Sequence, residues 1–189
     1  MNACTYMAFS AVEIHQPPTS TLIPNLMNSE IIDQLAAPSY LANYPRKDAD
    51  SERRPQLISL ADHPESSGTL MMSGLWLLHG FLDESHSISQ ESHSPEGSFW
   101  HPIMHRLEGD FWNSKYWYRK VGSHAAFETI SQSLSQIEGA SELFAGDQWD
   151  PETFVDLCEQ STHDSSLIDV THQLARVEWQ TLFDYSLPG

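Results

Sequence analysis

Histidines and carboxylates recur at helical spacing in the middle of the chain. On an α-helix, the offsets i, i+4 and i+7 place three side chains on one face. If two such segments form an antiparallel hairpin, four imidazoles and two carboxylates converge. The offsets occur twice, at His79, Asp83 and His86, and again at His101, His105 and Glu108.

Two kinds of chemistry suit such a cluster. Imidazole and carboxylate are ligands for zinc, iron or manganese, and helical bundles hold such ions between facing helices. Alternatively, a histidine oriented by a carboxylate can transfer protons near neutral pH. The candidate metal ligands are His79, Asp83, His86 and His105, and the candidate acid–base residues are His79, His105 and Glu108.

A purely structural interpretation of the same residues also stays open. His79 borders an apolar stripe and would then be a buried, hydrogen-bonded histidine. His101 and Asp110 would then only cap helices. The spacing therefore predicts where chemistry would take place, but it does not choose between a metal site, a metal-free proton-transfer site and a structural role.

A short stretch after the histidines concentrates positive charge and aromatic rings. Residues 69–189 contain five Lys or Arg against eighteen Asp or Glu, and four of the five cations lie between positions 106 and 120. We expect these cations to hold an anionic group and the neighbouring rings to pack a flat ligand. Alternatively, the cations pair with Glu108, Asp110 and other internal carboxylates. The candidate substrate-binding residues are Arg106, Lys115, Tyr116, Trp117 and Arg119.

The leading functional hypothesis is therefore an enzyme that acts on a small anionic or aromatic molecule. It would use acid–base chemistry between histidine and carboxylate, with or without a divalent metal, in a helical pocket. The alternative is a non-catalytic module that binds a partner through the same basic and aromatic surface, because Trp, Tyr and Arg dominate interface energetics.

Composition limits the other possibilities. The formal net charge of −17 disfavours binding to nucleic acid or to an anionic membrane surface. There are two cysteines, so a disulfide scaffold is not expected. The first residues lack the basic segment of a signal peptide, which makes the cytoplasm the expected compartment. No phosphate-binding loop or dinucleotide motif occurs, so no nucleotide cofactor is expected.

The pattern of prolines and apolar residues predicts an all-α protein with a loosely structured N-terminal arm. Residues 1–68 hold seven of the eleven prolines, which leaves room for one short helix around 28–37. Residues 69–189 are expected to form one domain, a bundle of about five helices, because each periodic segment there fits the helical repeat. We expect these helices at about 70–90, 101–109, 111–121, 123–137, 151–160 and 165–187.

One segment resembles the signature of an uncharacterised family of bacterial and fungal proteins. The resemblance rests on the order His-x3-His-Arg-x-Glu-x-Asp-x2-Asn-x-Lys-Tyr-Trp-Tyr-Arg, which runs from His101 to Arg119. The upstream stretch from Leu82 to His86 resembles the same signature, and the likeness covers roughly residues 74–128. It implies no known activity. It implies only that this segment is the distinctive part of such proteins.

Overall fold

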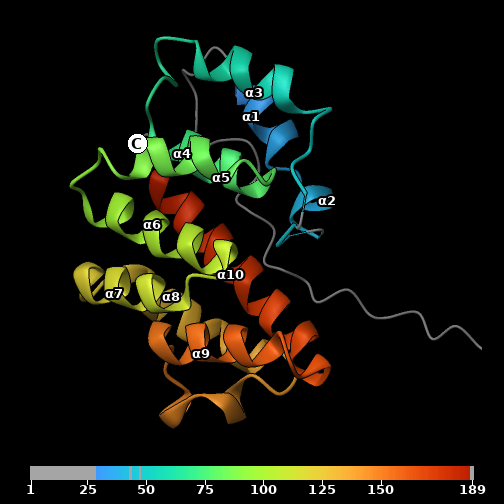
Figure 1. The fold of residues 1–189 in the computed structure, drawn as a ribbon, viewed down its shortest axis with the longest axis vertical. Coiled ribbons are helices and arrows are strands. Elements are labelled where there is room, and N and C mark those ends of the chain that lie inside the picture. Colours follow the sequence, from blue (N-terminus) through green and yellow to red (C-terminus); the bar gives the residue numbers. More distant parts are fainter. Residues whose placement is uncertain (1–28, 43, 47, 188–189) are drawn as a thin grey trace, which may run out of the picture.

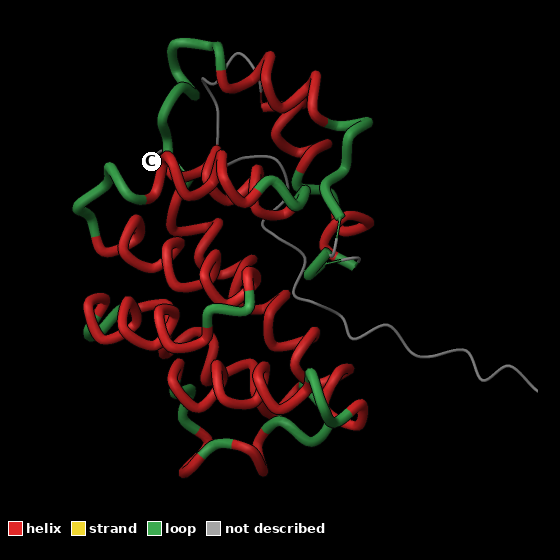
Figure 2. The backbone as a smooth tube through the Cα atoms, in the orientation of Figure 1, coloured by secondary structure: helices red, strands yellow, loops and turns green. Residues whose placement is uncertain are grey.

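The chain folds into helices throughout the part that the structure describes. In this computed structural model, that part comprises residues 29–42, 44–46 and 48–187. These residues form ten α-helices and four short 3-10 helices, with no strand among them (Figure 2). The all-α prediction is confirmed, although the region from residue 69 onward holds seven α-helices instead of about five.

Three short helices precede the main bundle; the first and third lie together at one end of the molecule, and the second lies at its side (Figure 1). They are α1 (Ser29–Leu35), α2 (Pro38–Leu41) and α3 (Arg54–Ala61). The short helix predicted around 28–37 corresponds to α1, whereas α2 and α3 were not expected. Both later helices have proline in their first turn, where the missing amide hydrogen costs no intrahelical bond. The predicted arm also includes residues 1–28, which lie outside the described residues.

The continuous helix predicted for residues 70–90 is wrong, because the chain breaks it after Leu78. The two pieces are α4 (Leu70–Leu78) and α5 (Leu82–Ser89). Gly80 between them has a φ of 80°, which side chains with a Cβ rarely adopt. A Cβ there would also lie 3.0 Å from the backbone of both Asp48 and Ala49. The close approach of the preceding loop therefore fixes the break.

The next helix begins earlier than expected. Helix α6 (Pro95–Glu108) starts at Pro95, and the Ser94 hydroxyl accepts a hydrogen bond from the Gly97 amide as its N-cap. The prediction of a start near His101 is wrong because Pro102 was expected in the first turn but lies inside the helix. The helix ends at Gly109, whose φ of 83° is left-handed.

The remaining helices follow the predicted start and stop signals more closely. Asp110 caps α7 (Phe111–Val121) by accepting from the Asn113 amide, and Asp150 caps α9 (Pro151–Ser161) in the same way through Thr153. Helix α8 (Ala125–Ser133) is shorter than expected. The segment from 134 to 147 contains three 3-10 helices, η1 (Leu134–Gln136), η2 (Ser141–Leu143) and η3 (Ala145–Asp147). The chain ends with η4 (Ser165–Leu167) and α10 (Ile168–Ser186).

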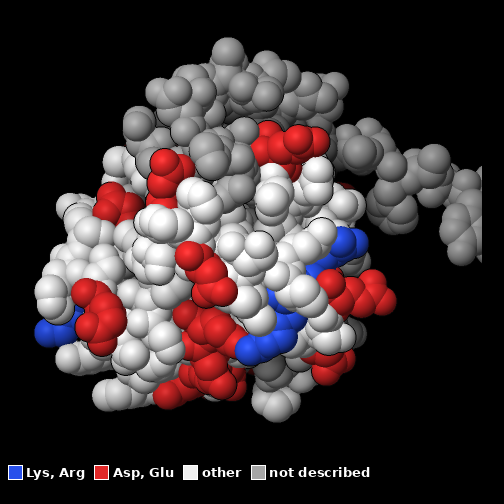
Figure 3. All heavy atoms as spheres, turned by 90° about the horizontal axis from the view of Figure 1, so that it is seen from above, with Lys and Arg blue, Asp and Glu red and all other residues white. Residues whose placement is uncertain are grey.

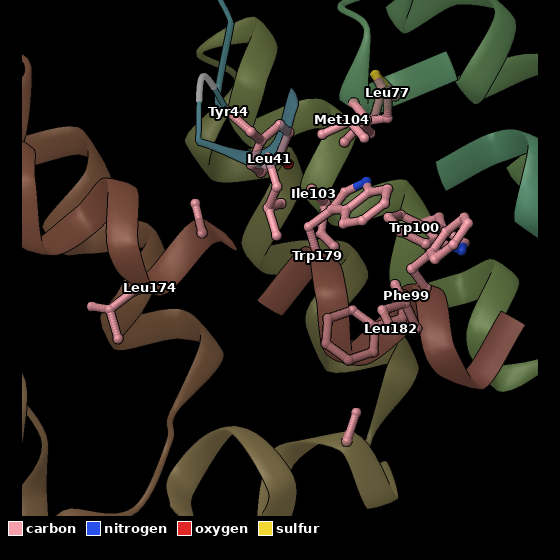
Figure 4. Packing of buried hydrophobic residues seen from close by; sticks show 14 of the residues in the cluster. Leu41, Tyr44, Leu77, Phe99, Trp100, Ile103, Met104, Leu174, Trp179 and Leu182 are labelled. Atoms are coloured by element: carbon pink, nitrogen blue, oxygen red, sulfur yellow. The ribbon is translucent and has the colours of Figure 1, made fainter. Parts of the chain in front are cut away.

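Helix α10 passes through the middle of the bundle and contacts α4, α6, α8 and α9 (Figure 1). Trp100 of α6 and Trp179 of α10 pack there with other apolar side chains (Figure 4). Both indoles are satisfied, because Trp179 donates to the Gly74 carbonyl at 2.9 Å and Trp100 donates to the Ser186 hydroxyl at 2.9 Å. This packing holds α4, α5 and α6 in a fixed arrangement. None of the described helices combines the length and apolar character needed to cross a membrane.

Candidate metal centre

Three histidine side chains from two adjacent helices converge. His86 lies on α5, whereas His101 and His105 lie one turn apart on α6, which packs against α5. The ring centroids are 4.6 Å apart for His86 and His101, 5.7 Å for His86 and His105, and 4.8 Å for His101 and His105. One ring nitrogen from each residue lies within 4.8 Å of the other two. We call these residues the histidine triad.

The spacing of the triad is close to that of a zinc site. Histidine nitrogens lie about 2.0–2.1 Å from a zinc ion, so two of them are about 3.4 Å apart in a tetrahedral centre. The widest nitrogen–nitrogen separation of 4.8 Å would then have to shorten by about 1.4 Å. Small rotations of the imidazoles can supply this change, and His86 has room for it because it is only partly buried.

Glu108 selects the tautomer of His105. Nδ1 of His105 lies 3.2 Å from Oε2 of Glu108, one turn along α6, and donates to that carboxylate. This contact places the proton on Nδ1 and leaves the lone pair on Nε2. The amide nitrogen of Asn113 on α7 lies 3.1 Å from Nε2 and 3.3 Å from Nδ1, so it contacts both ring nitrogens and does not distinguish them. A carboxylate that accepts from the distal nitrogen is the usual partner of a metal-bound histidine.

His101 is held neutral by its surroundings. Burial, together with repulsion from the neighbouring His105 and His86, lowers the pKa of His101 to about 4. The indole of Trp117 covers the ring, with centroids 4.0 Å apart. Because metal ions compete with protons for imidazole nitrogen, a neutral His101 is ready to bind an ion at neutral pH.

The structure places His79 and Asp83 away from these contacts. His79 is fully buried at the end of α4, where its Nε2 donates to the Leu35 carbonyl at 2.9 Å and its Nδ1 lies 3.7 Å from Asp50. Burial lowers the pKa of His79 against the opposing effects of Leu35 and Asp50. The break at Gly80 removes His79 from the face that carries His86. Asp83 is exposed on α5 and is not among the residues that converge with the triad.

Arg106 is buried in an internal ion pair. It forms a salt bridge with Glu178 of α10, and it donates to the hydroxyl of Tyr118 at 3.0 Å. Tyr118 in turn donates to Glu178. Burial acts to lower the pKa of the guanidinium, but Glu178, Tyr118 and Cys158 together outweigh it and raise that pKa. Arg106 therefore pairs with a buried carboxylate of α10 and a hydroxyl of α7.

The other two candidate cations point to α9. Lys115 forms a salt bridge with Asp156, and Arg119 forms one with Glu152, whose carboxylate also accepts from Nε of Arg119 at 3.1 Å. Arg119 and Glu152 line a hollow of about 340 Å³ at the start of α9, and no member of the triad lines it. The contacts of all three cations match the alternative that they pair with internal carboxylates.

On the face drawn in Figure 3, basic side chains are few, and they too lie beside acidic ones. Tyr116 is partly exposed on α7 and contacts Trp117 edge to face, with ring centroids 5.7 Å apart. Of the five residues expected to bind substrate, Trp117 is the one in direct contact with the triad.

Two residues of the site are not among the candidate ligands and acid–base residues named from the sequence. His101 belongs to the spacing pattern that predicts converging imidazoles, and a helix-capping role for it is only the structural alternative. Asn113 has no pattern that marks it, since its role depends on how α7 folds back against α6. The offset of four between His101 and His105 was the available signal for the pair on α6.

Comparisons with protein-family models, with curated proteins and with solved structures each find no match. The fold and the triad define the class of this protein only as an all-α bundle with a cluster of three histidines between two helices. Its function is inferred below from the geometry of that cluster.

Proposed function

We propose that the histidine triad binds one divalent transition-metal ion, and that the protein carries out metal-assisted acid–base chemistry on a small molecule there. The observation that carries the proposal is the convergence of three imidazole nitrogens within 4.8 Å of one another. Imidazole is a ligand for zinc, copper, iron and nickel. Zinc is the first ion to test, because three histidines on helices suit its tetrahedral preference.

The surrounding residues have separate tasks in this proposal. Glu108 fixes the tautomer of His105 and increases the basicity of its Nε2. Trp117 holds the ring of His101 and excludes water from it. Asn113 contacts the ring of His105 from α7, with its amide nitrogen 3.1 Å from Nε2 and 3.3 Å from Nδ1, and so limits how far that ring can turn.

Three protein ligands suit chemistry better than a purely structural role. Structural zinc sites use four protein ligands, whereas catalytic sites use three and leave a position for water or substrate. An ion in such a site supplies Lewis acidity and lowers the pKa of its bound water. Among the described residues, Glu108 is the carboxylate in contact with the triad. It accepts from Nδ1, on the opposite side of the His105 ring from an ion at Nε2, so we assign it the orientation of that ring and assign proton transfer to the water that the ion would bind.

The proposal does not assign anion binding to Arg106, Lys115 or Arg119, because each already pairs with a carboxylate of this chain. A metal-free site that transfers protons through His105 and Glu108 is a second candidate, favoured by their contact at 3.2 Å. A non-catalytic binding module is a third, favoured by the exposed ring of Trp112 on α7. Metal binding separates the first candidate from the other two.

The test is a titration of chelator-treated protein with zinc and with cobalt(II), whose visible spectrum reports on its ligands. The parent should bind one ion per chain. His86→Ala, His101→Ala and His105→Ala should each lower the affinity at least about tenfold. His163→Ala, which removes an exposed histidine beyond α9, should bind like the parent. Equal affinities in all five proteins, or no binding by the parent at micromolar zinc, would refute the proposal.

A further inference from the structure

We infer that the small molecule handled at the triad carries a flat ring system, and that this ring stacks on Trp112 and Tyr116. The inference rests on the proposed function, because it places the ring beside the metal position. The inferred substrate is a molecule that has one group with a metal-binding oxygen and one or more flat rings joined to that group. We call Trp112 and Tyr116 the aromatic ledge.

The two rings of the ledge lie on the solvent side of α7. Trp112 is 75% exposed and Tyr116 is 40% exposed, and Trp112 is the most exposed of the large hydrophobic side chains in the described part of the chain. Their planes are nearly parallel, inclined by 10° with centroids 6.0 Å apart. A third flat ring can stack on such a pair of parallel rings.

The fold does not need these two rings for its own stability. Helix α7 packs inward through Ser114 and Tyr118, which are buried and bond to Pro102 and Glu178. An indole that stays exposed to water does not contribute the hydrophobic free energy that its burial would contribute. Large exposed apolar groups commonly mark binding sites, and a ligand ring laid on the ledge would remove both rings from water.

The ledge is continuous with the triad through direct contacts. Tyr116 touches Trp117 with ring centroids 5.7 Å apart, and Trp117 touches His101 with centroids 4.0 Å apart. Asn113, next to Trp112 in the chain, reaches His105. A molecule that binds an ion at the triad through one end can therefore extend past Trp117 and Tyr116 and place a second ring on the exposed face of Trp112.

The charges around the ledge agree with a mainly uncharged ring. Lys115 and Arg119 turn toward α9 and are paired there, so they do not border the ledge. Lys120 lies over the ring of Tyr116, with its ammonium 5.3 Å from the centroid. Among the described residues, Lys120 is the cation beside the ledge, and it can take a single acceptor group at the outer edge of a bound ring.

The experiment compares two hydroxamates on zinc-loaded protein. Acetohydroxamate has the metal-binding group alone, whereas 4-phenylbenzohydroxamate carries the same group and two rings. The parent should bind the ring-bearing compound at least about tenfold more tightly, which is the range for stacking on an aromatic side chain. Trp112→Ala and Tyr116→Ala should reduce this preference several-fold, while Tyr185→Ala, which removes an exposed ring on α10, should keep it.

Zinc affinity is measured for each variant in the same series. A failure of the metal site can then be distinguished from a failure of the aromatic ledge. A parent that binds zinc but prefers neither hydroxamate overturns the ledge and leaves the metal site standing. An unchanged preference in Trp112→Ala and Tyr116→Ala also overturns the ledge, and the exposed rings would then favour a protein partner. If the parent binds no zinc, the proposed function fails first and the inference fails with it.

Discussion

The indole of Trp117 on α7 lies against the imidazole of His101 on α6, with ring centroids 4.0 Å apart and planes inclined by 43°. The contact covers a histidine that is only 4% exposed. Helix α7 therefore restrains a proposed metal ligand without supplying one itself at this position.

We expect Trp117→Ala to lower zinc affinity by about tenfold, because a ligand that is free to rotate must be ordered when the ion binds. Trp117→Phe should keep most of the affinity, since a smaller ring still covers His101. The measurement is a zinc titration against a competing chelator. Trp112→Ala on the same helix is the control and should have little effect. An unchanged zinc affinity in Trp117→Ala would mean that His101 is held by α6 alone.

The break between α4 and α5 gives a prediction about stability. Gly80 and Gly109 have nearly equal φ values of 80° and 83°, but only Gly80 has backbone atoms within 4 Å of the position that a Cβ would take. Gly109→Ala should lower the free energy of unfolding by about 1 kcal/mol, the cost of left-handed backbone. Gly80→Ala should cost about 3 kcal/mol, because it adds a clash with Asp48 and Ala49. Urea unfolding curves measure both, and equal losses would show that the preceding loop moves aside.

Helix type and several helix ends could be predicted from the sequence because local chemistry decides them. Asp110 and Asp150 cap α7 and α9 as expected, and Gly122 ends α7. Gly80 lies inside an apolar stretch with helical periodicity, and nothing local shows that another segment approaches it closely. The break, and with it the position of His79, depends on that tertiary contact.

The candidate site could be predicted only in part for a similar reason. The offsets within α5 and α6 are local, and they identified His86 and His105. The partners of Arg106, Lys115 and Arg119 lie 72, 41 and 33 residues away along the chain. A cluster of cations in one sequence segment therefore says little about whether they share a pocket, because each can turn to a different helix.

The buried His79 predicts a loss of stability in acid. Its pKa is lowered in the folded protein, so the unfolded chain binds more protons, and the free energy of unfolding falls as the pH drops below about 6.5. Burial shifts the pKa of His101, His124 and His172 in the same direction. In the presence of a chelator, the urea midpoint should be lower at pH 5 than at pH 7.5. His79→Gln, which can still donate to Leu35, should reduce this difference, and an unchanged pH dependence would assign the effect to the other histidines.

The ion pair between Arg106 and Glu178 predicts a large effect from a small substitution. Glu178 is fully buried, and it accepts from both Arg106 and Tyr118. Glu178→Gln leaves the guanidinium buried without a counter-charge, which should cost about 3–5 kcal/mol of unfolding free energy. Tyr118→Phe removes two hydrogen bonds, the one accepted from Arg106 and the one donated to Glu178, and should cost about 1–3 kcal/mol. Zinc binding by the folded fraction should not change, because neither residue contacts the triad.

The double variant of Arg106→Met and Glu178→Leu tests the cause of that loss. If the cost in Glu178→Gln arises from an unpaired buried charge, removing both charges should recover part of it. Unfolding free energies of the parent, Arg106→Met, Glu178→Leu and the double variant form the cycle. A double variant less stable than either single variant would show that the pair also contributes packing that apolar side chains cannot replace.

Asn113 offers a substitution that should strengthen the proposed site. Its amide nitrogen lies 3.1 Å from Nε2 of His105 and 3.3 Å from Nδ1, beside the ring of a proposed ligand. Asn113→Asp keeps the size of the side chain, removes the amide donor and puts a carboxylate oxygen near Nε2 of His105. Carboxylate is itself a zinc ligand, so zinc affinity should rise by at least about tenfold.

Asn113→Ala separates the two effects, because it removes the donor without adding a ligand and should give a smaller rise. Zinc competition titrations measure both variants, and the cobalt(II) spectrum should change only in Asn113→Asp, where a ligand is added. If Asn113→Asp binds zinc no more tightly than the parent, the ion does not lie on the Asn113 side of His105. The ion would then lie on the side of His105 that faces His86, and Glu108 and Asn113 would contact His105 on the opposite side.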